Sequence, residues 1–156
     1  DDFTNKEDSL VVLLDHLEDP HNFGAIIRTC EAAGVDGIII PKDRGVSVNP
    51  TVIKVSTGAI FHTPIARVTN LVQTMDRLKK EGFWIVGTDM EGTDYTEIDY
   101  KGKIVLVIGN EGKGMSSLVE KNCDFIASIP MRGTTNSLNA SVAAGILIYE
   151  AMKVRK

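Results

Sequence analysis

Short runs of apolar residues recur along the chain and alternate with longer amphipathic segments. Two of these runs, Leu10–Leu14 and Ile104–Ile108, contain no polar residue. Continuous runs of this kind are typical of strands that are buried on both faces of a parallel sheet. We predict six strands, at residues 10–14, 37–40, 65–68, 83–87, 104–108 and 125–129.

Helical segments follow most of the predicted strands. In the segment 70–80, Leu71, Met75 and Leu78 recur at helical spacing. Asn22 and Ser137 are candidate N-caps of two further helices. We predict helices at residues 22–33, 50–57, 70–80, 115–121 and 137–153, the first followed by Gly34 as its C-terminal glycine, and the longest irregular stretch at 89–103.

This alternation predicts an α/β fold with a mostly parallel six-stranded sheet and helices on both faces. In open sheets of this class, ligands bind beyond the carboxyl ends of the strands. We therefore expect the functional residues in the loops that follow strands.

Composition narrows the class of protein only slightly. The 156 residues fit one domain, and the formal net charge of −4 does not favour nucleic-acid binding by the surface as a whole. No apolar run is long enough to span a membrane and no signal peptide is evident, so we expect a cytoplasmic protein. Cys30 and Cys123 are far apart and lack metal-ligand spacing, so we expect two small core residues and no metal site.

The first loop with candidate chemistry follows the first strand and leads from Asp15 to Arg28 in the first helix. Asn22 in this segment could be a simple N-cap. Arg28 could be a solvated surface residue, but its neighbours in the helix are small or apolar. A single arginine in such surroundings needs a partner for its charge.

The second loop, Gly109–Gly114, follows the fifth strand and contains three glycines around Asn110, Glu111 and Lys113. It is not a phosphate-binding P-loop, because Met115 follows Gly114 where that motif needs lysine. It also lacks the third glycine of the dinucleotide-binding fingerprint. A tight strand-to-helix turn would explain the glycines, but it would not explain Glu111.

The third loop runs from Ile129 to Asn139 and leads into the last helix. Ser137 in this loop fits an N-cap. It is a poor candidate nucleophile, because no suitable general base accompanies it in the sequence.

Together, the three loops resemble the three motifs of the SpoU family of RNA methyltransferases in order and spacing. The residues that carry the resemblance are Asn22 with Arg28, the segment 109–114, and the segments 129–131 and 137–143. The resemblance covers nearly the whole chain. The third motif is most similar to that of enzymes that methylate a guanosine ribose in 23S ribosomal RNA.

The resemblance implies a fold with a C-terminal deep trefoil knot, a homodimer, and S-adenosylmethionine bound by the knot loops. It also implies that residues 1–156 form the catalytic domain, without the N-terminal RNA-binding domain of many relatives. The acidic balance of the chain fits that expectation. The residues expected to bind the cofactor are Thr88, Asp89, Gly109, Asn110, Glu111, Gly112, Ile129, Met131, Ser137 and Leu138.

The implied reaction is the attack of a ribose 2′-hydroxyl on the methyl group of the cofactor, which requires the hydroxyl to lose its proton. We expect Arg28 to bind the phosphate beside the target ribose and to be the candidate proton acceptor, and Glu111 to orient it or a neighbouring donor. Asn22, Ser137 and Asn139 are expected to position the hydroxyl. The local basic surface facing RNA is expected to consist of Arg28, Lys42, Arg44, Lys54 and Arg132.

Four other interpretations stay open at this point. The target could be a ribose in transfer RNA. The chain could be a non-catalytic module on the same fold that binds cofactor and RNA. It could be a flavodoxin-like nucleotide-binding domain, although that fold has no use for the third motif. It could also be a related knotted enzyme that methylates a base nitrogen in transfer RNA.

Overall fold

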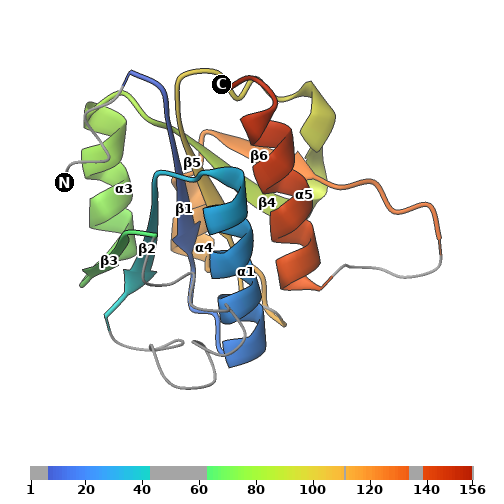
Figure 1. The fold of residues 1–156 in the computed structure, drawn as a ribbon, viewed down its shortest axis with the longest axis horizontal. Helices are drawn as coiled ribbons and strands as arrows, with labels where there is room; N and C mark the ends of the chain where they lie inside the picture. Colours follow the sequence, from blue (N-terminus) through green and yellow to red (C-terminus); the bar gives the residue numbers. More distant parts are fainter. Residues whose placement is uncertain (1–6, 43–62, 111, 134–138, 156) are drawn as a thin grey trace.

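The computed structural model describes residues 7–42, 63–110, 112–133 and 139–155 (Figure 1). The predicted helix at 50–57 lies outside these residues. The described strands are β1 (Ser9–Leu14), β2 (Gly37–Pro41), β3 (Ile65–Val68), β4 (Trp84–Asp94), β5 (Lys103–Ile108) and β6 (Phe125–Ser128). The described helices are α1 (Pro20–Ala33), α3 (Leu71–Lys80), α4 (Ser117–Lys121) and α5 (Ala140–Met152), with a short 3-10 helix η3 (Tyr95–Glu97).

The six strands form one parallel sheet in the order β3-β2-β1-β5-β4-β6, which confirms the predicted α/β fold. The central strands β1 and β5 pair in register from Ser9 with Lys103 to Leu14 with Ile108. Both are covered on two faces, which explains why their sequences are apolar without alternation.

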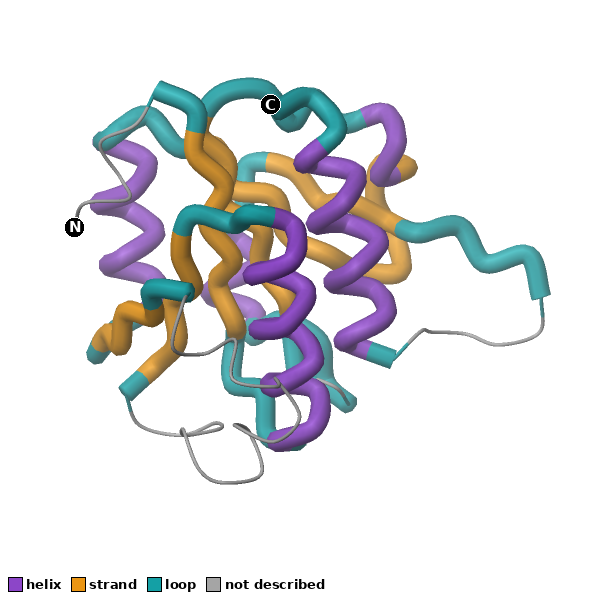
Figure 2. Tube along the Cα trace, viewed as in Figure 1, coloured by secondary structure: helices purple, strands orange, loops and turns teal. Residues whose placement is uncertain are grey.

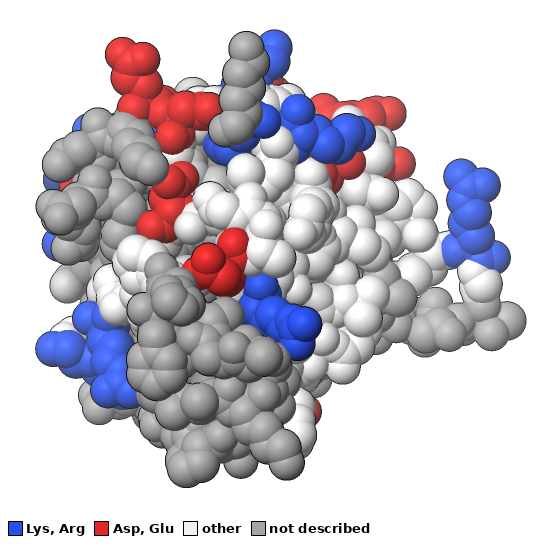
Figure 3. All heavy atoms as spheres, viewed as in Figure 1, with Lys and Arg blue, Asp and Glu red and all other residues white. Residues whose placement is uncertain are grey.

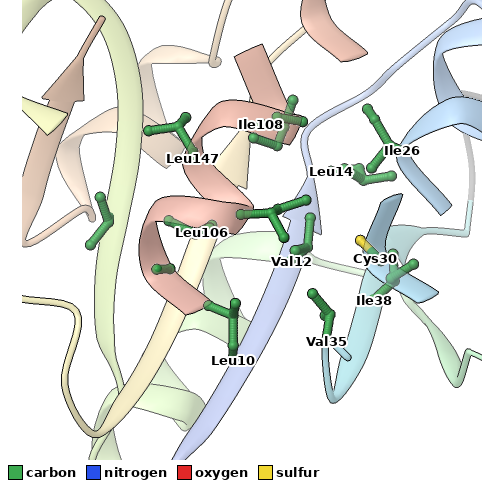
Figure 4. Packing of buried hydrophobic residues seen from close by; sticks show 14 of the residues in the cluster. Leu10, Val12, Leu14, Ile26, Cys30, Val35, Ile38, Leu106, Ile108 and Leu147 are labelled. Carbon is green, nitrogen blue, oxygen red and sulfur yellow. The ribbon is translucent and has the colours of Figure 1, made fainter. Parts of the chain in front are cut away.

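Helices lie on both sides of the sheet and divide the core into two layers (Figures 1 and 2). Leu10, Val12 and Leu14 of β1 pack toward α1 and α5 (Figure 4). Val11 and Leu13, which alternate with them, pack toward α3 and α4. Each such fully buried aliphatic side chain contributes about 1.5–3 kcal/mol through the hydrophobic effect. No helix within the described ranges combines the length and apolar character needed to cross a membrane.

Both helices beside the first and third motifs begin at different residues than predicted. Helix α1 begins at Pro20, and the Asp19 side chain accepts a hydrogen bond from the His21 backbone N–H, so Asp19 rather than Asn22 is the N-cap. Proline at the first helical position needs no hydrogen-bond partner for its nitrogen, which favours this earlier start. The predicted C-terminal glycine, Gly34, has the expected left-handed conformation, with φ of 84°.

Helix α5 begins at Ala140 rather than at Ser137. Its N-cap is Asn139, whose side chain accepts a hydrogen bond from the Ser141 backbone N–H. Ser, Asn and Asp are all favoured caps, so a segment that contains Ser137 and Asn139 offers two starts that sequence alone does not separate.

Strand β4 continues to Asp94, so it covers part of the stretch that was predicted to be irregular. Ala127 of β6 pairs with Thr88 and again with Thr93. One edge of Ala127 cannot pair with both residues, so Thr88 and Thr93 must lie along opposite edges of β6. Strand β4 therefore turns at residues 89–92 and borders β6 on both sides. Gly92 permits this close turn, because a Cβ atom there would lie 2.6 Å from the Ile126 carbonyl oxygen. The predicted knot also involves residues 134–138, outside the described ranges, and stays a prediction.

Arg155 ties the end of the chain to the segment that returns to β5. Its guanidinium donates to the backbone carbonyls of Tyr100, Ala151 and Gly102 at 2.7, 2.8 and 2.6 Å, and the side chain is only 5% exposed. We expect Arg155→Met to lower the free energy of unfolding by about 2 kcal/mol, because hydrogen bonds from a charged group contribute more than neutral ones.

Urea denaturation of the Arg155→Met variant measures this loss. Lys153→Met is the matched control, since the Lys153 side chain is 69% exposed and contacts Glu150 at 3.4 Å. Exposed ion pairs contribute about 0–1 kcal/mol, so a comparable loss in both variants would contradict a special role for Arg155.

Candidate functional site

A cavity of about 570 Å³ lies at the carboxyl ends of β5 and β6 and beside the middle of β4. This volume is typical of sites for small molecules and cofactors. The cavity is formed by the middle of β4, by the ends of β5 and β6 with the segments that follow them, and by the first half of α5. Its lining consists of Thr88, Asp89, Met90, Ile108, Gly109, Asn110, Gly112, Lys113, Gly114, Ala127, Ser128, Ile129, Pro130, Met131, Gly133, Ala140, Ala143 and Leu147.

The cavity brings together residues of the second loop, of the third loop and of β4, which are far apart in the sequence. The expected cofactor-binding residues in its lining are Thr88, Asp89, Gly109, Asn110, Gly112, Ile129 and Met131. The other three, Glu111, Ser137 and Leu138, lie outside the described residues. Sequence reasoning missed Met90 and the three α5 residues, because no local pattern indicates which helix covers the end of a sheet. Lys113 also lines the cavity, and its place in the second motif could have identified it as a cofactor-binding candidate.

The backbone at Gly109 passes too close to the following loop to accept a side chain. A Cβ atom there would lie 2.5 Å from the Gly114 carbonyl carbon and still closer to the Met115 backbone nitrogen. The loop is closed by two backbone hydrogen bonds of 2.9 Å between Asn110 and Gly114, the latter with φ of 71°. Glycine adopts that conformation with the least strain. The loop therefore needs Gly109 because there is no room for a side chain, and Gly114 because of its positive φ.

The remaining walls of the cavity combine hydrogen-bonded polar groups with exposed apolar side chains. The Thr88 hydroxyl donates to the Val107 carbonyl at 3.1 Å, and the Asp89 carboxylate accepts from the Met90 backbone N–H at 2.6 Å. Met90 and Met131 are 62% and 39% exposed. Two unbranched thioether side chains at a cavity can adapt their packing to a flat ligand.

A group of polar residues at the end of β1 lies directly beside the second motif. Asp15 is 1% exposed, and its carboxylate is 2.6 Å from the His16 Nδ1 atom and accepts from the Ser116 backbone N–H at 2.7 Å. His16 has φ of 60°, the one positive φ among the described residues other than glycines. Asp15 could have been singled out from the sequence, because an aspartate that immediately follows an apolar strand is unfavourable there unless its carboxylate is hydrogen-bonded.

The residues expected to act in catalysis are not all part of the cavity lining. Arg28 is exposed on α1, and Asn22 is buried in the first turn of the same helix. Neither is among the described lining residues. Asn139 caps α5, and the next residue, Ala140, lines the cavity. The cavity and the Asn22–Arg28 helix are therefore neighbouring parts of one end of the sheet, but a single chain does not merge them into one pocket.

The expected basic surface is divided in the same way. Lys42 is exposed directly after β2, and Arg132 is exposed in the segment that follows β6. Three strands of the sheet, β1, β5 and β4, lie between β2 and β6. Arg44 and Lys54 lie outside the described residues.

Neither cysteine has the properties of a nucleophile. Burial raises the pKa of the Cys30 thiol to about 12, as expected of a core residue. Cys123 is partly buried, and burial followed by the charge of Glu120 raises its pKa to about 12. Both thiols are therefore protonated at neutral pH. Within the described ranges, no three His, Cys, Asp or Glu side chains are grouped so that they could hold a metal ion.

Solved structures of RNA methyltransferases share this fold over nearly the whole chain. The SpoU methyltransferase AviRb of Streptomyces viridochromogenes, in complex with S-adenosylmethionine, matches with a TM-score of 0.91 and 36% identity, over 99% of this chain and 63% of its own. A TrmH/SpoU tRNA modifying enzyme of A. aeolicus matches with a TM-score of 0.84 and 35% identity, over 97% of this chain and 77% of its own.

Sequence comparison gives the same relationship. A protein of Staphylococcus saprophyticus that is assigned to the TrmH family of tRNA/rRNA methyltransferases is 57% identical over 148 residues, which are 94% of this chain. The chain spans 59% of that relative's length. The family model of the SpoU rRNA methylases matches residues 9–149, from the first strand to the last helix. The chain therefore belongs to the SpoU rRNA methylase family.

Proposed function

We propose that the chain transfers the methyl group of S-adenosylmethionine to a ribose 2′-hydroxyl in RNA. The observation that carries this proposal is the cavity at the ends of β5 and β6, which is lined by the segments that hold the second and third family motifs. A cavity of about 570 Å³ has room for a ligand of this size. The AviRb structure, which shares the fold, holds the same cofactor.

The residues present fit the proposed cofactor. Gly109 brings backbone close to the cavity, where a Cβ atom would clash with the following loop, and the flat adenine would lie against such exposed backbone. Met131 adds an apolar wall, and Asp89 and Lys113 place one negative and one positive group in the lining, as a zwitterionic ligand end requires. When bound, S-adenosylmethionine would supply an electrophilic methyl group to an oxygen nucleophile.

The chain must bind and orient the weak nucleophile. We infer that Arg28 binds the phosphate beside the target ribose with its two-pronged guanidinium. A protonated guanidinium has no acceptor site. Arg28 would have to lose one of its own protons to solvent before it could take the hydroxyl proton, so proton transfer is a second and more demanding role for it. Asn22, Ser137 and Asn139 would position the hydroxyl, and Glu111 would orient Arg28 or a neighbouring donor.

A guanosine of 23S ribosomal RNA is the first proposed target and transfer RNA the alternative. The relatives support RNA but divide on its kind, since their names include both rRNA methyltransferases and tRNA modifying enzymes. The resemblance of the third motif to the ribosomal enzymes favours the first. We also propose a cytoplasmic location, because the relatives are bacterial and ribosomal and transfer RNA are made and used in the cytoplasm of bacteria.

We also propose that the chain acts as a homodimer through the outer face of α1 and α5. Apart from Ser141 and Glu150, helix α5 is built of apolar residues and glycine, and Val142 and Tyr149 are 50% and 51% exposed. Helices that are apolar on most sides are normally buried. Figure 3 shows a largely uncharged surface over α5. Arg28 lies on α1 beside this face, so a second copy would bring it next to another chain.

Isothermal titration of the purified chain with S-adenosylmethionine and with its demethylated product tests the proposed function. We expect saturable binding of both with one site per chain. Absence of binding by a folded, dimeric chain would contradict the proposal and favour a non-catalytic relative.

A further inference from the structure

Asn110 lies between the cavity loop and the turn that leads to α1. Its side-chain oxygen accepts hydrogen bonds from the backbone N–H groups of Gly112 and Lys113, at 2.9 and 3.1 Å. Its side-chain nitrogen donates to the His16 carbonyl at 2.8 Å and reaches the Glu18 carboxylate at 3.4 Å. One end of the amide therefore shapes its own loop, and the other end binds a different loop, more than 90 residues away in sequence.

The turn at His16 is held in a form that presents its carbonyl to Asn110. A residue other than glycine with φ near 60° needs support from its surroundings. Asp15 gives that support, because its buried carboxylate is 2.6 Å from the His16 ring nitrogen. The same carboxylate accepts from the Ser116 backbone N–H at the far end of the cavity loop. Two separate contacts thus join the cavity loop to this turn.

We propose that Asn110, supported by Asp15, couples the cavity loop 109–116 to the turn 15–19, so that the cavity and the start of α1 move as one unit. Asn110 is one of the residues that line the cavity, and its side chain makes the contacts that carry this coupling. The consequence for the reaction rests on the proposed function. There, Asn110 is a positioning residue that fixes the methyl donor relative to the residues that α1 carries, Asn22 and Arg28.

The side chain of Asn110 offers a substitution that separates its two roles. In Asn110→Asp, both oxygens can still accept from Gly112 and Lys113, so the cavity loop keeps its own hydrogen bonds. The donor to His16 is lost, and a carboxylate is placed against a carbonyl oxygen and against Glu18. Asn122→Asp is the matched control, because the Asn122 amide also donates to a backbone carbonyl, that of Leu118 at 2.8 Å, in a different part of the chain.

Hydrogen exchange measured by mass spectrometry tests the coupling without any need for activity. We expect Asn110→Asp to increase exchange in residues 15–19 as well as in 110–116, at least about threefold in rate, and Asn122→Asp to leave both segments unchanged. If exchange in 15–19 were the same in Asn110→Asp as in the wild type, the coupling would be disproved, whether or not the chain methylates RNA.

Kinetics then test the positioning role. At saturating S-adenosylmethionine, we expect Asn110→Asp to lower kcat about tenfold or more, with the Kd for the cofactor changed less than about threefold, because misplacement costs rate rather than binding. The positioning role would be overturned if Asn110→Asp lost cofactor affinity by the same factor as kcat. It would also be overturned if its kcat equalled that of Asn122→Asp. A wild-type chain that binds no cofactor would refute the proposed function instead, and the exchange result would still decide the coupling.

Discussion

Replacing Gly109 with alanine is expected to lower the affinity for S-adenosylmethionine by about 100-fold or more, equivalent to about 2.7 kcal/mol. The added Cβ would lie 2.5 Å from the Gly114 carbonyl carbon and nearer still to the Met115 nitrogen, so the backbone of the cavity loop must move. Neither contact is with a flexible side chain that could rotate away. The displacement would change the wall of the cavity that the adenosine part of the cofactor is proposed to contact.

Another glycine of the same cavity, Gly133, provides a matched control. It has nothing within 4 Å of an added Cβ. Gly133→Ala should therefore keep an affinity within about threefold of the wild type, since exposed substitutions without clashes change free energies by about 0.5 kcal/mol. Titration calorimetry on the two variants gives the result. Equal losses in both, or unchanged binding by Gly109→Ala, would place the cofactor elsewhere.

Arg28→Lys is expected to lower the rate of methyl transfer about 1000-fold, within the range for loss of a group that takes part in proton transfer or orientation. Lysine keeps the positive charge, but it cannot bind a phosphate through two parallel N–H groups. Affinity for S-adenosylmethionine should stay close to that of the wild type, because Arg28 is not among the described residues of the cavity lining. Single-turnover transfer to RNA, together with calorimetry, separates the two quantities.

Arg77→Lys is the matched control for Arg28. Arg77 is exposed on α3, which covers the opposite face of the sheet, so the same substitution there should leave the rate unchanged. A rate for Arg28→Lys near that of the control would reject the assignment. Mixing Arg28→Ala chains with Gly109→Ala chains adds a further test. Recovery of activity in the mixture would indicate that Arg28 serves the cavity of a second copy.

The sheet was predictable because burial imposes a direct pattern on its strands. The central strands β1 and β5 need apolar residues on both faces, and their uninterrupted runs gave their positions within one residue at each end. The end of β4 was not predictable in the same way. Residues 89–94 are polar, small or exposed, and they form strand only because β6 offers them a second edge. Pairing of this kind depends on contacts between distant segments, which no local pattern records.

The site was partly predictable, because the topology of a parallel sheet brings certain loops together. Loops that follow parallel strands meet at one edge of the sheet, so Gly109 and Ile129 could be expected to share a cavity from their places in sequence alone. The contacts of Asp15 and Asn110 could not be derived, because they depend on which side of a tight loop each side chain faces. The predicted starts of two helices, at Asn22 and at Ser137, were wrong, because another favoured cap, Asp19 or Asn139, lies within three residues of each.

Analysis of the methylated product tests the central claim most directly. The purified chain is incubated with S-adenosylmethionine carrying a labelled methyl group and with 23S ribosomal RNA or transfer RNA, and the RNA is then digested to nucleosides. We expect label in a 2′-O-methylated nucleoside, 2′-O-methylguanosine for the ribosomal substrate, and none with Arg28→Ala. Label on a base nitrogen, or no transfer to any RNA by a chain that binds the cofactor, would contradict that claim.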